Sequence, residues 1–329
     1  MADKESIVTR KNFTTQYRHD TYPRLQGRLA NSTVSGKSVF LTGAGKGIGV
    51  AIALAFARAG PRVIFLCGRT RSTLEETRAR IQSASPTVKA EVIVVDIGKG
   101  IKSVLDAFSE ARELDLNRPV DILVNNAAYL AAELVVSENP DDDERVFDAN
   151  WNHYAVNVRG SLALATAFLR NSTAIGPTII NISSGAAVLD HVPLIGCYSS
   201  SKLATLKMYS DLSYEQAHRG LAIFHLHPGS VQTSMSAPGA NSADTGMYNW
   251  LLPQTAQGPR IANHVAREST SAQLSADFAV WLTSSEAQFL HNRLIYANWD
   301  VDELLAKKET ILAGDYLKLG VTGWNSTAY

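Results

Sequence analysis

Cysteine is scarce in this sequence, because 329 residues include only two, Cys67 and Cys197. Two cysteines are too few for a disulfide framework and are typical of a protein kept in a reducing compartment. An excess of charge of one sign is also lacking, since 31 basic residues balance 31 acidic residues. Nothing in that balance calls for nucleic acid or an anionic membrane surface as a partner.

Long apolar runs are missing as well. The longest stretches, such as residues 162–169, fall far short of the ~20 residues that a membrane span requires. The N-terminus, residues 1–10, is polar and mixed in charge, without the apolar core of a signal peptide. We therefore expect a cytoplasmic protein that is not associated with a membrane.

Short apolar runs alternate with segments of helical periodicity from residue 38 onward. Strands are predicted at residues 38–42, 63–66, 92–95, 120–124, 178–182, 222–226 and 294–296. Helices are predicted at residues 48–59, 73–83, 102–113, 143–169 in two pieces, and 198–217. Buried strands alternating with amphipathic helices predict an α/β fold, with a doubly wound parallel sheet of about seven strands covered on both faces.

A glycine-rich turn joins the first strand to the first helix, with the sequence Thr42-Gly43-Ala44-Gly45-Lys46-Gly47-Ile48-Gly49. Glycine lets a backbone turn tightly and approach a pyrophosphate closely, and the N-terminus of the following helix attracts phosphate. A strict G-x-G-x-x-G does not fit these residues, whereas T-G-x-x-x-G-x-G does. On this motif alone, an ordinary glycine-rich turn without a ligand stays open.

This spacing resembles that of the short-chain dehydrogenase/reductase family, and the resemblance continues along the chain to about residue 300. Four further segments resemble the family's N-N-A-G, N-I-S-S, Y-x-x-x-K and P-G-x-V-x-T motifs: Asn125-Asn126-Ala127-Ala128, Asn181-Ile182-Ser183-Ser184, Tyr198 to Lys202, and Pro228-Gly229-Ser230-Val231-Gln232-Thr233. The first departs at Ala128, where the family has glycine. A likeness to reductases of filamentous fungi is fainter.

The resemblance implies a single Rossmann-type domain at residues 36–300. We expect residues 1–35 to form an extension on its surface and residues 301–329 to form a C-terminal extension. A long segment at residues 234–275, which contains aromatic side chains such as Trp250, is interpreted either as a lid over a mainly apolar substrate or as a packed surface helix.

Tyr198 and Lys202 are the central catalytic candidates. On a helix, positions i and i+4 share a face, so the two side chains point the same way. An unperturbed tyrosine has a pKa of ~10, and a neighbouring ammonium group is expected to lower it, so that Tyr198 can exchange a proton near neutral pH. A lone Y-x-x-x-K is weak evidence, and the neighbouring motifs give it weight.

The resemblance assigns roles to two more residues. Ser184 would hydrogen-bond the substrate oxygen and stabilise developing charge. Because Ser184 lies 14 residues before Tyr198, one more than is typical, Ser183 stays open as a substitute. Asn157, in the segment Asn157-Val158-Arg159-Gly160, would hold a water in contact with Lys202 for proton relay.

The resemblance also implies a set of cofactor contacts. Asp96 would contact the adenine amino group, Lys202 the nicotinamide ribose, and Val231 and Thr233 the carboxamide. The full expected set is Gly43, Gly45, Lys46, Gly47, Ile48, Gly49, Arg69, Asp96, Ile97, Asn125, Ala127, Tyr198, Lys202, Pro228, Gly229, Val231 and Thr233.

The end of the second strand predicts NADP(H) rather than NAD(H). An acidic residue there would hold the ribose hydroxyls of NAD and repel a 2′-phosphate. Residues 66–70 contain no acid, and Arg69 offers a charged, planar donor fork suited to phosphate. Lys46 would add a second positive charge.

The predicted function is therefore reduction of a ketone or aldehyde by NADPH, with Tyr198 as general acid/base. An NAD-dependent alcohol dehydrogenase, a non-redox isomerase and a cofactor-binding scaffold of the same fold are the alternatives. A small-molecule substrate and a homo-oligomer, dimer or tetramer, are expected. His225 and His227 have no third ligand at suitable spacing, so no metal site is expected.

Overall fold

Seven parallel strands form one sheet in the described part of the chain, which comprises residues 13–173, 175–189, 192–233 and 269–320 of the computed structural model. The strand order is β3-β2-β1-β4-β5-β6-β7, and every neighbouring pair is parallel. The strands are β1 (Ser38–Thr42), β2 (Val63–Gly68), β3 (Lys89–Val94), β4 (Ile122–Asn125), β5 (Thr178–Ile182), β6 (Ala222–His227) and β7 (Leu294–Tyr296). The predicted fold class is confirmed.

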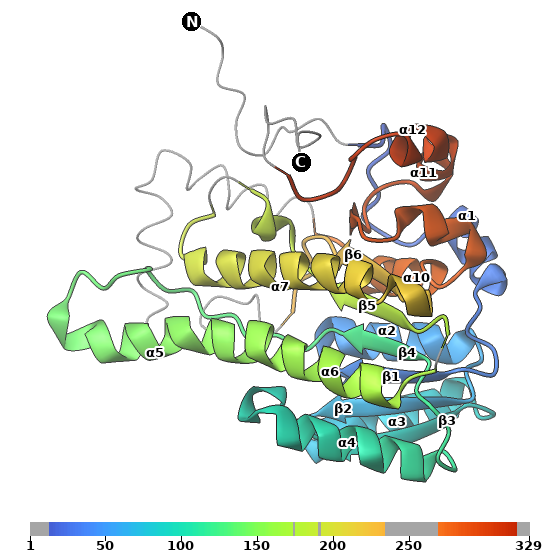
Figure 1. The fold of residues 1–329 in the computed structure, drawn as a ribbon, viewed down its shortest axis with the longest axis horizontal. Helices are drawn as coiled ribbons and strands as arrows, with labels where there is room; N and C mark the ends of the chain where they lie inside the picture. The colour runs from blue at the N-terminus through green and yellow to red at the C-terminus, as the bar shows by residue number, and fades with distance from the viewer. Residues whose placement is uncertain (1–12, 174, 190–191, 234–268, 321–329) are drawn as a thin grey trace, which may run out of the picture.

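Helices cover both faces of the sheet. One face carries α4 (Ile101–Leu114), α6 (Ser161–Asn171) and α7 (Gly196–Glu215), which lie in front of the sheet in Figure 1. The other face carries α2 (Gly47–Arg58), α3 (Arg71–Ala84) and α10 (Ala272–Trp281). Along β1, Val39 and Leu41 join the core on the α2 side and Phe40 joins the core on the α4 side, because successive strand residues point to opposite faces.

The remaining helices are short or extend these layers. They are α1 (Pro23–Arg28), α5 (Asp143–His153), a π-helix (Tyr154–Gly160), α11 (Val301–Ala306) and α12 (Lys308–Leu312). Short 3-10 helices occur at Leu29–Asn31, Ile97–Lys99, Pro140–Asp142, Gly185–Ala187, Ala217–Arg219 and Ser285–Leu290. Among the described helices, none has the length and apolarity needed to cross a membrane.

The two-piece helix predicted at residues 143–169 is continuous in the structure. The π-helix connects α5 directly to α6, so the chain changes its helical pitch without leaving the helix. π-Helical turns are rare and are found mostly at functional sites. This one contains Asn157, a predicted site residue.

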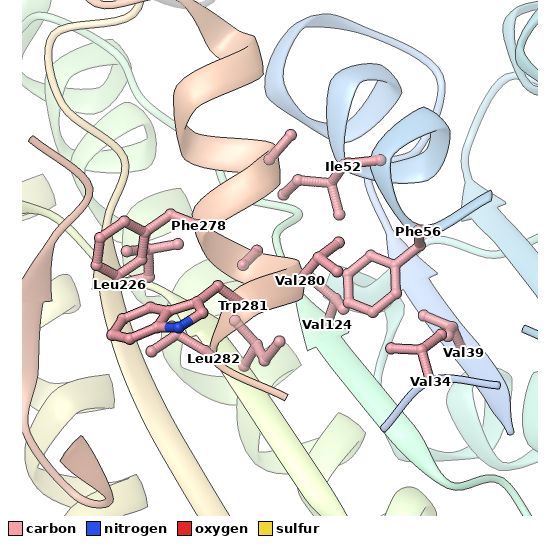
Figure 2. Packing of buried hydrophobic residues seen from close by; sticks show 14 of the residues in the cluster. Val34, Val39, Ile52, Phe56, Val124, Leu226, Phe278, Val280, Trp281 and Leu282 are labelled. Atoms are coloured by element: carbon pink, nitrogen blue, oxygen red, sulfur yellow. The ribbon is translucent and has the colours of Figure 1, made fainter. Parts of the chain in front are cut away.

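For the segment at residues 234–275, predicted as a lid or as a packed helix, the last residues belong to a packed helix, because Ala272 begins α10. This helix is part of the core: Val280 faces Phe56 and Val124, and Phe278 lies beside Leu226 (Figure 2). From Leu274 to Trp281 its apolar side chains have no exposed surface, which is incompatible with a mobile cover. Residues 234–268 lie outside the described residues.

The N-terminal segment is packed more deeply than the expected surface extension. Leu25 and Val34 are fully buried in the core on the α2 side. The Tyr22 hydroxyl accepts a hydrogen bond from the backbone N–H of Val301 at 2.9 Å. The blue α1 and the dark red α11 lie side by side in Figure 1, so the two ends of the described chain complete one another's packing.

Contacts of Arg18 strengthen the same junction. Its backbone N–H and C=O bond to Asn298 at 2.7 and 2.6 Å, and its guanidinium pairs with Asp300 at 2.7 Å. The backbone N–H groups of Thr15 and Gln16 donate to the Glu303 carboxylate. Residues 13–35 are therefore held to residues 298–303 by main-chain as well as side-chain bonds.

Replacing Leu25 with alanine should destabilise the whole domain. A fully buried leucine in a close-packed core typically costs about 2–5 kcal/mol of unfolding free energy when it is truncated. Urea unfolding measures this, with Leu312→Ala as the control, because Leu312 is half exposed on α12. Equal effects of the two substitutions would show that the N-terminal segment is only a surface extension.

Candidate active site

A pocket of about 460 Å³ lies at the carboxyl-terminal ends of the strands. Ligand sites of open parallel sheets form at these carboxyl-terminal strand ends. The pocket is lined by predicted site residues from several elements: Gly43, Gly45, Lys46, Gly47, Ile48, Gly49, Arg69, Asp96, Ile97, Ala127, Tyr198, Lys202, Pro228 and Thr233. Residues scattered over 190 positions of sequence thus line one cleft, from Gly43 to Thr233.

The glycine-rich turn has no room for side chains. A Cβ atom at Gly49 would lie 2.0 Å from the carbonyl oxygen of Gly43, and one at Gly45 would lie 2.3 Å from Oγ1 of Thr73. Gly47 has a φ of +52° and lies against Thr233. The turn therefore presents bare backbone to the pocket at the N-terminus of α2, as binding of a dinucleotide phosphate requires.

Thr42 locks this turn to the end of β4. Its hydroxyl accepts hydrogen bonds from the backbone N–H groups of Asn126 and Ala127, both at 3.0 Å. The side-chain amide of Asn126 donates to the Thr42 carbonyl at 2.9 Å. Asn126 also lines the pocket, although it was absent from the predicted set. Its position in the segment Asn125-Asn126-Ala127-Ala128 is the sequence feature that could have identified it.

Asn125 lies behind the pocket rather than in its lining. Its side-chain amide donates to Ser161, Asn181 and Tyr209 at 2.8 to 3.2 Å. It is buried and connects β4 with β5, α6 and α7. Asn125 therefore makes structural contacts behind the pocket, and its contact with the cofactor stays a prediction.

Tyr198 and Lys202 both lie on α7 and both line the pocket. Lys202 donates from Nζ to the carbonyl oxygen of Ile182 at 2.8 Å, and this nitrogen lies 5.8 Å from the centre of the Tyr198 ring. Ser184 hydrogen-bonds Tyr198. Ser183 lines the pocket, but its buried hydroxyl has no hydrogen-bond partner among the described residues. Of the two serines, Ser184 is thus the one that contacts the tyrosine, whereas Ser183 and not Ser184 lines the pocket.

Burial dominates the ionisation of both groups. Burial raises the pKa of Tyr198 to about 12, and the hydrogen bond from Ser184 opposes this only in part. Burial also lowers the pKa of Lys202 to about 8. The expectation that Lys202 lowers the pKa of Tyr198 is not met here, since desolvation disfavours both charged forms. Tyr198 consequently keeps its proton at neutral pH.

Asn157 is anchored by protein partners on every side. Its Oδ1 accepts from the backbone N–H of Tyr129 at 2.7 Å, and its Nδ2 donates to the Tyr129 carbonyl at 3.0 Å and to Ser201 at 2.9 Å. Its main-chain carbonyl accepts from the hydroxyls of Ser161 and Thr205. The water relay to Lys202 stays a prediction.

The segment after β6 contributes only part of its predicted set to the pocket. Pro228 and Thr233 line it, whereas Gly229 and Val231 do not. Gly229 has a φ of +83°, and a Cβ there would lie 2.6 Å from Thr270, so this glycine serves a tight backbone turn. His227, just before it, accepts a hydrogen bond from the backbone N–H of Gly185 at 3.0 Å and so fixes the turn that carries Ser184.

Several further residues line the pocket, and of these only Ser183 had been considered, as a substitute for Ser184. They are Thr42, Cys67, Gly68, Thr70, Thr73, Leu74, Val95, Asn126, Ala128, Tyr129, Val156, Ile182 and Ser183. Most of them adjoin a predicted residue in sequence, so their position beside the end of a strand could have identified them. No sequence signal identified Val156, which lines the pocket from the π-helix. Within the described residues, no group of three or more His, Cys, Asp or Glu side chains could hold a metal ion.

The profile of the short chain dehydrogenase family matches residues 37–243. The chain belongs to this family. A "Short chain dehydrogenase mpl6" of Monascus purpureus is 33% identical over 305 residues, covering 92% of this chain and 93% of its own. A "Short chain dehydrogenase/reductase" of Claviceps purpurea is 32% identical over 329 residues, covering 96% and 99%. The predicted family is confirmed, and the chain is an oxidoreductase that uses a nicotinamide cofactor.

Solved structures agree with this assignment. A dehydrogenase/reductase from Sinorhizobium meliloti has a TM-score of 0.63 at 25% identity, covering 82% of this chain and 97% of its own. A short chain dehydrogenase from Burkholderia cenocepacia, solved in complex with NADP, shares the fold with a TM-score of 0.62 at 23% identity, over 80% and 96% of the two chains.

Replacing Lys202 with methionine should make this dehydrogenase more stable at pH 7. The pKa difference between the ordinary 10.5 and the folded value of about 8 corresponds to about 3 kcal/mol. Loss of the bond to Ile182 leaves a carbonyl unpaired, which reduces the expected gain to roughly 1–2 kcal/mol.

The pH dependence gives this prediction its sign. The unfolded chain binds a proton that folded Lys202 lacks between about pH 8 and pH 10.5, so this group makes stability rise with pH in that window. The advantage of Lys202→Met in urea unfolding should therefore shrink as pH rises from 8 to 10. Lys207→Met, an exposed site on the same helix, is the control. An advantage that stays constant with pH would contradict the assignment.

Proposed function

We propose that this dehydrogenase reduces the carbonyl group of a small, mainly apolar molecule with NADPH. One observation carries the proposal: a single cleft extends from the glycine-rich turn and Arg69 to Tyr198 and Lys202. The bare backbone of the turn fits a pyrophosphate, and the tyrosine that lines the cleft fits a reacting oxygen. When bound, the nicotinamide supplies the hydride.

Tyr198, Ser184 and Lys202 would perform the remaining steps of the reaction. Tyr198 donates its proton to the substrate oxygen, and its pKa of about 12 means that this proton is present at neutral pH. Ser184 hydrogen-bonds the same oxygen and stabilises its developing charge. Lys202, anchored on Ile182, supplies positive charge beside the phenol and binds the nicotinamide ribose.

The protonated form of Tyr198 is the one that reduction of a carbonyl group requires. Asn157 supports the proposed proton relay through its fixed place beside Ser201 on α7.

The rim of the cleft supports NADPH as the preferred cofactor. Arg69 and Lys46 both line the cleft and are exposed, so their charges are available to a ligand. Their pairing with a phosphate would be charge-assisted and, for Arg69, bidentate. The NADP complex of the Burkholderia relative is consistent with this preference.

Replacing Arg69 with aspartate should reverse the cofactor preference. Loss of a charge-assisted phosphate contact should raise the Kd for NADPH by about 10–100-fold, with less than about a threefold change for NADH. Fluorescence titration with both cofactors measures this. Arg80→Asp makes the same charge change on the exposed side of α3, away from the cleft, and should leave both constants nearly unchanged. Equal losses for both cofactors would overturn the role of Arg69.

The reaction itself is tested by NADPH oxidation with a panel of aromatic and aliphatic ketones and aldehydes. We expect steady turnover with at least one apolar carbonyl compound. Tyr198→Phe should lower kcat by about 10²–10⁴-fold, because the proton donor is lost, with little change in NADPH binding.

Other outcomes would favour the alternatives. Tighter binding of NADH with oxidation of alcohols would indicate an NAD-dependent alcohol dehydrogenase. Product formation without net NADPH consumption would indicate a non-redox isomerase. NADPH binding without turnover of any compound would leave a cofactor-binding scaffold.

A further inference from the structure

Three side chains of one helix hold the backbone of the segment that follows β4, residues 129–135. Positions 150, 153 and 157 are spaced by three and four residues, so they share one face of the helix formed by α5 and the π-helix. Asn157 binds both backbone groups of Tyr129, as described above. Asn150 donates to the carbonyl oxygens of Leu134 and Val135 at 2.8 and 3.3 Å.

His153 makes the central contact and is nearly fully buried. Its Nε2 lies 3.1 Å from the backbone nitrogen of Ala131, and its Nδ1 lies 3.2 Å from the carbonyl oxygen of Asn150. A backbone N–H can only donate and a carbonyl can only accept, so Nε2 must carry the lone pair and Nδ1 the proton. Both partners therefore require the neutral Nδ1–H form of His153.

The ring of His153 also lies between two tyrosines of the cleft. Its centre is 5.0 Å from that of Tyr129 and 6.2 Å from that of Tyr198, both in edge-to-face geometry. Such pairs are favourable beyond the area they bury and restrict ring orientation. Tyr129 lines the cleft beside Tyr198. One imidazole thus contacts both the proposed proton donor and the wall next to it.

Two further contacts connect the same segment to the residues that precede α7 and to α5. The backbone N–H of Glu133 donates to the carbonyl of Leu194 at 2.8 Å, four residues before Tyr198. The buried Glu133 carboxylate pairs with Arg145 of α5 at 2.6 Å. Leu194 has a φ of +62°, which is strained for leucine and must be held by its surroundings. Residues 129–135 therefore connect α5 to the chain that leads into Tyr198.

We propose that His153 is a positioning residue, which sets the ring of Tyr198 and holds residues 129–135 as a fixed wall of the substrate site, with the Tyr129 ring facing an apolar substrate. This proposal rests on the proposed function for its kinetic consequence. Its structural part, a hydrogen bond that immobilises the segment, is measurable without any substrate.

The wild-type protein provides the first test. In ¹⁵N-histidine NMR, assigned by the loss of one signal pair in His153→Gln, His153 should show a protonated Nδ1 and an unprotonated Nε2 at pH 7. The Nε2–H form or a charged ring at pH 7 would overturn the proposal, because neither can accept from Ala131.

Hydrogen exchange in variants provides the second test. His153→Leu removes the acceptor, so exchange of the peptide containing residues 129–135 should accelerate by at least about tenfold relative to wild type. His153→Gln places an amide oxygen near the position of Nε2 and should restore most of the protection. His291→Leu is the matched control: His291 also accepts from a backbone N–H, that of Ile223 at 3.0 Å, but away from the cleft. Wild-type exchange in His153→Leu would overturn the proposal, and so would equal acceleration in His291→Leu.

Kinetics with the best carbonyl compound of the panel test the positioning role. His153→Leu should lower kcat by roughly tenfold and raise KM severalfold, since a misplaced acid loses rate steeply, with the Kd for NADPH within about twofold. His153→Gln should recover most of kcat, and His291→Leu should change neither constant. Equal losses in His153→Leu and His153→Gln would exclude the hydrogen bond as the cause. If the panel yields no substrate, the proposed function fails, while the NMR and exchange results still decide the role of His153.

Discussion

The hydroxyl of Thr42 joins the two central strands of the sheet at the point where the cleft begins. It receives the backbone N–H groups of Asn126 and Ala127 and donates to Val124, so the ends of β1 and β4 are held in one register. Parallel pairing then fixes the ends of the other strands relative to these two. The glycine-rich turn, Ser184 and the chain after His227 each follow a strand end, so their mutual placement depends on this register.

Burial of ionisable groups is the second constraint on the site. Lys202 is buried and Tyr198 is partly buried on α7, and desolvation there disfavours the charged forms of both. A dry environment strengthens the electrostatic interactions of a reacting oxygen with its partners. The free-energy cost of desolvating these two groups is offset by packing in the rest of the core. On one face of the sheet α2 packs against α10 (Figure 2), and on the other the rings of Phe40 and Phe108 are stacked.

Sequence patterns predicted the fold and the lining of the cleft well, because both depend on local signals. The strands at Ser38–Thr42, Thr178–Ile182 and Leu294–Tyr296 have the predicted bounds, since short apolar runs there end at glycine or polar residues. The glycine-rich turn was recognisable because its residue types are required by backbone geometry alone.

Features that depend on contacts between distant segments could not be predicted in this way. Leu25 and Val34 lie in a polar stretch, and only the packing of α1 beside α11 shows that they belong to the core (Figure 1). The pKa of Tyr198 depends on how deeply α7 is covered, which no spacing of Tyr and Lys encodes. His153 carries no motif, and its partners at Ala131 and Asn150 are main-chain groups that are independent of residue type.

The π-helix explains how one helix can serve both the segment after β4 and the active-site helix α7. In an α-helix, the carbonyl of Asn157 would accept from the backbone N–H of residue 161. Here this carbonyl accepts from the hydroxyls of Ser161 and Thr205, and the latter belongs to α7. Within this π-helix, the Asn157 carbonyl makes a contact between helices, and the Asn157 side chain is directed at Tyr129. A rare helical geometry persists when such contacts offset its cost. The contacts of Asn157, one turn beyond His153, link the proposed substrate wall to the helix that holds Tyr198.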